Sequence, residues 1–182
     1  SEKSGKVILT GTVESLAERN LVEETVRRSV GENYSLAGLS VSPPLVPDYE
    51  VQRNIATAVP AHCQVELHDF QIEVQNGNVT LKGRTNALHH KTIAEHVAAN
   101  TRGVRSVTNN IRVDGPKESD TLIRENIVSL LNPYLKDHNL SGVNVSVQIG
   151  QVTLKGEYST YDQERYIKEV AQNVPGVVAV KN

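Results

Sequence analysis

Two identical pentapeptides, Val79-Thr-Leu-Lys-Gly83 and Val152-Thr-Leu-Lys-Gly156, decide how this sequence folds. Each lies inside a longer string of one form, Gly77-Asn-Val-Thr-Leu-Lys-Gly83 and Gly150-Gln-Val-Thr-Leu-Lys-Gly156. A third string, Gly5-Lys-Val-Ile-Leu-Thr-Gly11, follows the same pattern. The strings are 72 and 73 residues apart. A repeated period of this kind indicates a chain built from similar structural units.

The match continues beyond each string without a gap. Residues 14–31, 86–103 and 159–176 align over a helix-length stretch that ends in glycine. Proline-containing segments, 42–47 and 114–117, separate the repeats, and proline stiffens such joints. The sequence therefore predicts three units, and these names are kept below: unit one is residues 1–42, unit two 43–115 and unit three 116–182.

The ends of the sequence cut into the repeat. Unit one begins directly at its repeat glycine, Gly5, and unit three stops at Asn182, where unit two continues to Val113. The sequence shows no signal peptide and does not begin with Met. We therefore expect a mature or excised fragment with any targeting segment removed.

Each complete unit is predicted to have the order helix, strand, strand, helix, strand. The first helix begins near Asp48 or Ser119 and carries apolar residues at helical spacing. These residues are Val51, Ile55 and Val59 in unit two, and Leu122, Ile123, Ile127, Leu130 and Leu131 in unit three, where Pro133 is expected to end the helix. The second helix spans about 88–101 or 161–174. Its predicted apolar face is Ile93, Val97 and Ala98, or Tyr166, Ile167, Val170 and Ala171.

Strict alternation of apolar and polar residues predicts strands with one buried and one wet face. The alternation runs through Phe70, Ile72 and Val74 in unit two and through Val143, Val145, Val147 and Ile149 in unit three. Asn76-Gly77, and Ile149-Gly150 at the equivalent place, predict tight hairpin turns. In the next strand Val79, Leu81, Val152 and Leu154 should face inward, and Thr80, Lys82, Thr153 and Lys155 outward.

Glycine and a final strand complete each unit. Gly103 and Gly176 are expected in the left-handed conformation at helix ends, and a last strand is predicted over 104–113. Because only one strand face is apolar, both helices should cover the same face of a three-stranded sheet, so the fold class is α+β. Unit one retains only strand, helix and strand. Its closing strand is in doubt because Glu32 and Ser35 replace the two valines of the pattern.

The ordered set G-x-V-x-L-x-G, a four-turn helix and G-V-x-x-V-x-N resembles the BON family (bacterial osmotic-stress and nodulation domain). The matching residues are Gly77, Val79, Leu81, Gly83, Gly103, Val104, Val107 and Asn109, and in unit three Gly150, Val152, Leu154, Gly156, Gly176, Val177, Val180 and Asn182. The resemblance implies a bacterial, mostly periplasmic or envelope-associated protein involved in attachment to phospholipid or to the envelope. Similar modules build inner-membrane rings of type III secretion systems. No catalytic residue belongs to the family pattern.

Composition excludes several classes of protein. The net charge is −2, with 19 basic and 21 acidic residues, which argues against sequence-independent nucleic-acid binding. The helix and strand order also resembles some KH domains, but their RNA clamp needs a G-x-x-G loop that this sequence lacks. The longest aliphatic run, Val177 to Val180, is far short of a membrane span. A single cysteine, Cys63, cannot form an internal disulfide bond.

Histidines are the residues most able to carry chemistry, and five of six lie in unit two: His62, His68, His89, His90 and His96. His89 and His96 share one helix face but should lie about 10 Å apart, too far for one metal ion. His62 and Cys63 are adjacent, but a Cys–His nucleophile pair needs a third orienting group and a pocket, and the sequence offers neither. We therefore interpret these as surface histidines with a partly buried Cys63, and expect no metal or cofactor site.

Charged residues give two further patterns. Arg84, Arg102, Arg105 and Arg112 form a modest basic set near strand ends of unit two, either a solvated rim or a contact for lipid phosphates or an acidic partner. Glu23, Glu24, Arg27 and Arg28 have the spacing of ion pairs on a helix surface.

The sequence thus favours a non-enzymatic periplasmic or cell-envelope module that attaches to membrane phospholipid or to neighbouring envelope proteins. The alternative is a structural subunit of a secretion-system ring, which assembles by packing of its units. The expected partners are envelope proteins or further copies of the chain, with at most weak binding of phospholipid. No nucleic acid, small-molecule substrate or cofactor is expected.

Overall fold

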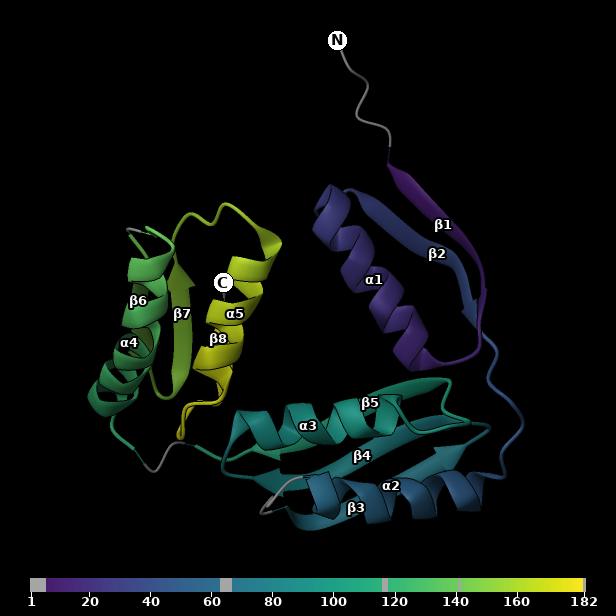
Figure 1. Cartoon of the computed structure of the whole chain (residues 1–182). Coiled ribbons are helices and arrows are strands. Elements are labelled where there is room, and N and C mark those ends of the chain that lie inside the picture. Colours follow the sequence, from purple (N-terminus) through teal and green to yellow (C-terminus); the bar gives the residue numbers. More distant parts are fainter. Residues whose placement is uncertain (1–5, 63–66, 116–117, 141, 182) are drawn as a thin grey trace. The chain divides into compact units, whose positions relative to one another are not determined.

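The computed structural model describes residues 6–62, 67–115, 118–140 and 142–181. Its strands form three separate small sheets, with strand orders β1-β2, β3-β4-β5 and β6-β7-β8 (Figure 1). Helices accompany each sheet, so the chain is α+β, as the sequence predicts. Each sheet lies within one sequence repeat, and the three are described one at a time.

Unit three shows the repeated architecture in full. Its elements are α4 (Asp120–Asp137), β6 (Asn144–Gln148), β7 (Gln151–Lys155), α5 (Tyr161–Gln172) and β8 (Ala179–Lys181). β7 is central, antiparallel to β6 and parallel to β8. Both helices cover the same face of this sheet (Figure 1). Val152 and Leu154 are buried against Ile127 of α4 and Ile167 of α5, which confirms the predicted register.

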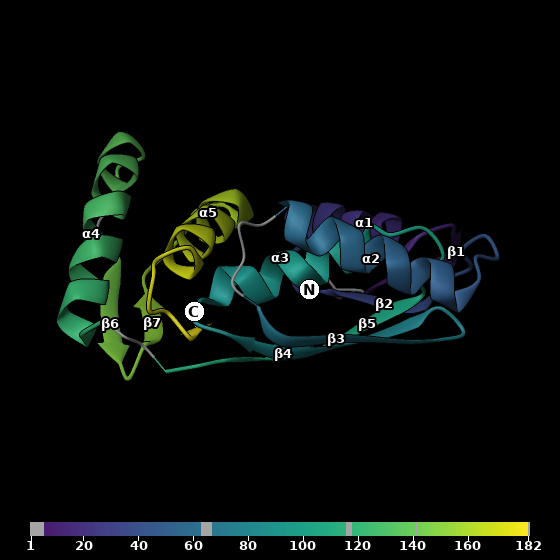
Figure 2. The same ribbon diagram turned by 90° about the horizontal axis from the view of Figure 1, so that it is seen from below.

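Unit two repeats this order. Its elements are α2 (Asp48–His62), β3 (His68–Gln75), β4 (Asn78–Thr85), α3 (Leu88–Ala99) and β5 (Ser106–Val113). Figure 2 shows α2 and α3 on the same side of the sheet. Val79 and Leu81 are buried as predicted, and so are the α2 residues Val51, Ile55 and Val59. The spacing of four therefore identified the helix face that makes the core.

The outward residues of the two central strands differ from the prediction. Lys155 is exposed, but Thr80, Lys82 and Thr153 are half-buried. Each of these central strands has a neighbour on both sides, whose side chains cover part of its outer face. Lys82 also places its Nζ atom 2.6 Å from Glu73 Oε1 on the adjacent strand.

The hairpin turns of both units are held by an aspartate from the start of the first helix. Asp120 accepts hydrogen bonds from the backbone N–H groups of Ile149 (2.7 Å) and Gly150 (2.9 Å). Asp48 accepts the same two bonds from Asn76 (2.7 Å) and Gly77 (2.9 Å). The turn residues of both hairpins have positive φ, as a type I′ turn requires.

Ile149 departs from the predicted alternation. The pattern extends to this residue as if it were the last inward residue of a strand, but it occupies the turn, with φ of 50°. Its side chain is 71% exposed. A β-branched residue is strained in the left-handed region, where asparagine is tolerated.

Two predictions for the helices of unit three were wrong. α4 continues through Pro133 to Asp137. Tyr134 and Leu135, beyond the proline, pack against the core, which offsets the backbone hydrogen bond that a proline removes. Leu122 and Leu130, predicted in the apolar stripe, are exposed, as is Tyr166 on α5.

Unit two shows a similar shift in α3, where the buried face is Ala94, Ala98 and Ala99. Ile93 and Val97, predicted on that face, are half-buried. Gly103 and Gly176 both have positive φ, which confirms their predicted conformation. At Gly103 an added Cβ would lie 2.7 Å from a carbon atom of Val46, so no larger residue fits there.

Unit one consists of β1 (Val7–Val13), α1 (Leu16–Val30) and β2 (Tyr34–Val41). The closing strand that the sequence left in doubt is present: β2 pairs in parallel with β1, from Val7 opposite Tyr34 to Val13 opposite Val41. The backbone ladder needs no valine at positions 32 and 35 because it uses main-chain groups. Within residues 6–42 no residue is buried.

None of the helices described combines the length and apolar character needed to cross a membrane.

Candidate functional site

The histidines of unit two do not converge on one point. His68 and His96 are exposed, whereas His89 and His90 lie together at the start of α3. The rings of His89 and His90 meet edge to face, with centroids 4.1 Å apart. His90 Nδ1 lies 3.0 Å from the hydroxyl of the buried Thr85. The pair therefore belongs to the local packing between β4 and α3.

The acidity of His89 is perturbed. Partial burial lowers its pKa below the ordinary value of 6.5, because desolvation disfavours the charged ring. Its Nδ1 atom is buried and has no hydrogen-bond partner among the atoms described. His89 is thus held neutral near physiological pH.

Residues Cys63 to Glu66 lie outside the described residues, as does the side chain of His62, so the predicted Cys63–His62 neighbourhood is not described. In the part of the chain that is described, no three His, Cys, Asp or Glu side chains gather as metal ligands would.

The arginine set of unit two divides between the two ends of β5. Arg105 precedes the strand and Arg112 lies near its far end, seven residues on, or about 23 Å along an extended strand. Arg84 is paired with Asp69, with Nη2 2.8 Å from Oδ2. Arg102, Arg105 and Arg112 are exposed. The arginines offer separate cationic points rather than one basic patch.

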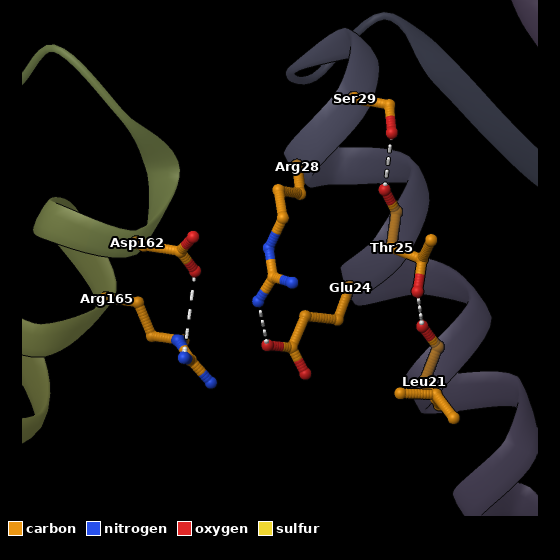
Figure 3. A network of polar contacts seen from close by, with 7 residues as sticks. All are labelled: Leu21, Glu24, Thr25, Arg28, Ser29, Asp162 and Arg165. Carbon is orange, nitrogen blue, oxygen red and sulfur yellow. Dashed lines mark hydrogen bonds and ion pairs between the residues drawn. The ribbon is translucent and has the colours of Figure 1, made fainter.

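The acidic and basic residues of unit one form the predicted pairs along α1. Arg27 Nη2 lies 3.6 Å from Glu23 Oε1, and Arg28 Nη2 lies 3.3 Å from Glu24 Oε1. Figure 3 shows the second pair beside the hydroxyl bonds of the same helix, in which Thr25 donates to the Leu21 carbonyl oxygen at 2.8 Å. These contacts stabilise a helix surface.

Asp48, the acidic residue at the start of α2, also has a structural role. Both carboxylate oxygens of Asp48 accept turn amides, and the turn carbonyl oxygen of Gly77 accepts a bond of 2.8 Å from the Arg105 N–H. The shallow groove at this hairpin is lined by the proline linker, the turn and Arg105. An arginine beside apolar linker residues suits contact with a protein or an anionic group, and it provides no acid–base pair.

Unit three carries an aromatic stack beside an exposed leucine on its helical side. Tyr134 of α4 stacks on Tyr166 of α5 with ring centroids 4.0 Å apart, and on His138 at the same distance. Leu130 lies one helical turn before Tyr134 and is 57% exposed; Tyr166 is 41% exposed. We call Leu130, Tyr134, His138 and Tyr166 the tyrosine strip. Tyrosines held rigid by stacking are common anchors in protein interfaces.

Comparison with family models identifies the family to which this architecture belongs. The model of the BON domain matches residues 1–32, 47–115 and 119–182. The chain belongs to the BON domain family. The second and third matched segments contain the whole of the second and third sheets, whereas the first contains β1 and α1 and ends before β2.

Solved structures resemble this BON chain only distantly. Two are of CdsD, a structural protein of the type III secretion system of Chlamydia trachomatis. The first is 14% identical, covers 96% of this chain and 77% of CdsD, and has a TM-score of 0.30. The second, of the C-terminal domain, is 15% identical with coverage of 100% and 85% and a TM-score of 0.31. No curated protein matches the sequence.

The tyrosine strip is the feature that sequence reasoning missed. The sequence predicts Leu130 and Tyr166 in the core because both residues fall near the helical apolar stripes. A signal was available: Ile123, Ile127 and Leu131 already form a complete stripe at spacing four, so Leu130 lies beside that stripe rather than in it.

Proposed function

We propose that this BON chain is a non-enzymatic module of the bacterial cell envelope that binds other proteins, including further copies of itself. The observation that carries the proposal is the tyrosine strip. It joins a rigid aromatic stack to an exposed leucine on a helical surface, as docking faces between proteins do.

The opposite surface of unit three supports the same conclusion. The outer face of its sheet carries Asn144, Ser146, Gln148, Gln151 and Lys155, all exposed. This surface has neither apolar area nor clustered cations, so it is poorly suited to anchor in a membrane. Attachment through the helical faces to envelope proteins requires neither.

The test measures self-association of the intact chain by light scattering over a range of concentrations. We expect weak association that increases with concentration and is lost in Leu130→Ser/Tyr166→Ser. Leu122→Ser is the matched control, because Leu122 is another exposed leucine of α4, two turns before Leu130. Association that is unchanged in the double variant, or lost equally in the control, would overturn the role of the strip.

Phospholipid attachment is the second candidate, supported by the exposed Arg102, Arg105 and Arg112. Residues 43–115 carry seven basic and seven acidic groups, so this unit becomes cationic when its histidines take up protons. Cosedimentation with anionic phospholipid vesicles should therefore be weak at neutral pH, strengthen on acidification and weaken with salt. Tight vesicle binding at neutral pH and physiological salt would instead make lipid anchoring the main role.

A further inference from the structure

The hairpin turn of unit two contains the one Asn-Gly pair of the sequence, Asn76-Gly77. The Asn76 side chain is exposed, whereas Gly77 is buried. An Asn-Gly pair is prone to spontaneous deamidation, because glycine has no side chain to shield the backbone nitrogen that follows the asparagine or to restrict its torsions. In unit three the equivalent pair is Ile149-Gly150, which carries no side-chain amide. Of these two turns, only that of unit two can undergo the reaction.

Deamidation at this turn needs water and no catalyst. The Gly77 nitrogen gives up its proton, and its electron pair forms a bond to Asn76 Cγ. The Cγ–Nδ2 bond breaks, and Nδ2 leaves with that proton as ammonia. Water then opens the cyclic imide, either at Cγ to give aspartate or at the main-chain carbonyl carbon of residue 76 to give isoaspartate. Both products carry a carboxylate in place of the neutral amide.

In the folded unit the attacking nitrogen is held by a hydrogen bond. Gly77 donates its N–H to Asp48 Oδ1 at 2.9 Å, and Asn76 donates its own N–H to Asp48 Oδ2 at 2.7 Å. The carbonyl oxygen of Gly77 accepts a bond of 2.8 Å from the Arg105 N–H. Both main-chain polar groups of Gly77 are therefore engaged while the turn is closed.

The backbone geometry of the turn also keeps the two reacting atoms apart. Asn76 has φ of 51° and Gly77 has φ of 75°. In a type I′ turn the first central residue has ψ of about +30°, which directs the following nitrogen away from that residue's Cβ. Ring closure therefore requires rotation about the Asn76 Cα–C bond. Room for this movement is limited, since a Cβ added at Gly77 would lie 2.5 Å from the Gly103 carbonyl oxygen.

The charge of Asp48 opposes the reaction as well. The Gly77 nitrogen must become negatively charged to attack, and a carboxylate at hydrogen-bond distance raises the energy of that state. After the reaction, residue 76 carries a second carboxylate next to the one that binds the turn, and the two repel each other. Isoaspartate also lengthens the main chain by one CH₂ group. Repulsion and chain length both disfavour reclosure of the turn.

We propose that Asn76 is a deamidation site that Asp48 keeps unreactive while the turn between β3 and β4 is closed. Opening of the turn frees the Gly77 nitrogen, and the reaction then makes a transient opening permanent. The inference concerns chemical ageing of unit two and is independent of the tyrosine strip of unit three.

The experiment incubates the intact chain at mildly alkaline pH and follows conversion of residue 76 by peptide mapping with mass spectrometry. We expect the folded chain to react at least about tenfold more slowly than the same chain unfolded in guanidinium chloride, because reaction requires opening of the turn. Asp48→Ala should speed the reaction of the folded chain by at least about fivefold, since both hydrogen bonds to the carboxylate are lost. Equal rates in the folded and unfolded chain would overturn the proposal.

Val59→Ala is the matched control for a general loss of stability. Val59 is a buried residue of α2 about three helical turns from Asp48, so this variant destabilises unit two without removing a bond to the turn. If Asp48→Ala reacts no faster than the unaltered chain, or no faster than Val59→Ala, the proposal is wrong. A slower reaction in Asp48→Ala would show that the carboxylate acts as a base, which also contradicts it.

Unit three provides an independent version of the same test. Ile149→Asn creates a second Asn-Gly turn, which Asp120 holds at the same two distances. In this variant we expect residue 149 to react as slowly as Asn76, and at least about fivefold faster when Asp120→Ala is added. Fast reaction at residue 149 with Asp120 in place would show that the aspartate does not protect such a turn, and would overturn the proposal.

Discussion

Unit one and unit three carry the same glycine and apolar pattern, yet only unit three encloses a core. Val152 and Leu154 are buried because α4 and β6 cover them, whereas Val7 and Leu9 have α1 and β2 alone among the described residues of unit one. The motif therefore encodes a strand, a helix and a parallel partner strand in both places. Enclosure of the core is a separate property, contributed by the leading helix and strand.

The largest expected difference between the two units is in the response to core truncation. Leu154→Ala should destabilise unit three by about 2–5 kcal/mol, because a fully buried leucine leaves a cavity. Leu9→Ala should cost unit one about 1 kcal/mol or less, because the half-buried side chain loses less apolar burial. Hydrogen exchange of β7 and β1 under increasing denaturant measures both effects. Equal losses would show that unit one has an enclosed core after all.

Asp48 and Asp120, which hold the hairpin turns, allow units two and three to be compared directly. Asp120→Ala should destabilise unit three by about 1–2 kcal/mol, because two turn amides lose a charged acceptor. Asp48→Ala should do the same in unit two, where the two distances are equal to those in unit three. Urea unfolding followed by unit-specific exchange tests this prediction. A loss of stability in one unit only would mean that Asp48 and Asp120 do not contribute equally.

A smaller effect is expected where the two turns differ. Ile149→Asn should stabilise unit three by about 1 kcal/mol, because asparagine adopts positive φ more readily than a β-branched residue. The reciprocal change, Asn76→Ile, should destabilise unit two by a similar amount. Thermal unfolding of the two variants checks the signs. Loss of stability in Ile149→Asn would show that the exposed isoleucine makes a stabilising contact.

The pH dependence of unit two is expected to be the smallest effect. The pKa of His89 is lowered in the folded protein, so below the ordinary pKa of 6.5 the unfolded chain takes up the proton first. Stability of unit two should therefore fall as the solution is acidified, and His89→Gln should make that fall shallower. His96→Gln, at an exposed position on the same helix, is the control. Identical pH profiles for all three proteins would contradict the assignment to His89.

Sequence reasoning predicted the repeat, the element order and the inward residues of the central strands, because all of these are periodic. It missed what depends on three-dimensional neighbours. Pro133 does not end α4, since packing of Tyr134 and Leu135 outweighs the local cost. The spacing of Ile123, Ile127 and Leu131 indicated that Leu130 lies beside the stripe, but the stacking of Tyr134 on Tyr166 joins two helices, so the tyrosine strip emerged only from the structure.

That units two and three enclose a core while unit one does not is tested most directly by native-state hydrogen exchange of the intact chain. The exchange is resolved at the three homologous strands β1, β4 and β7. The structure predicts strong and similar protection of Val79–Leu81 in β4 and Val152–Leu154 in β7. Val7–Leu9 in β1 should exchange at least about tenfold faster, because its edge is unpaired and its face incompletely covered. Equal protection at all three strands would contradict this account.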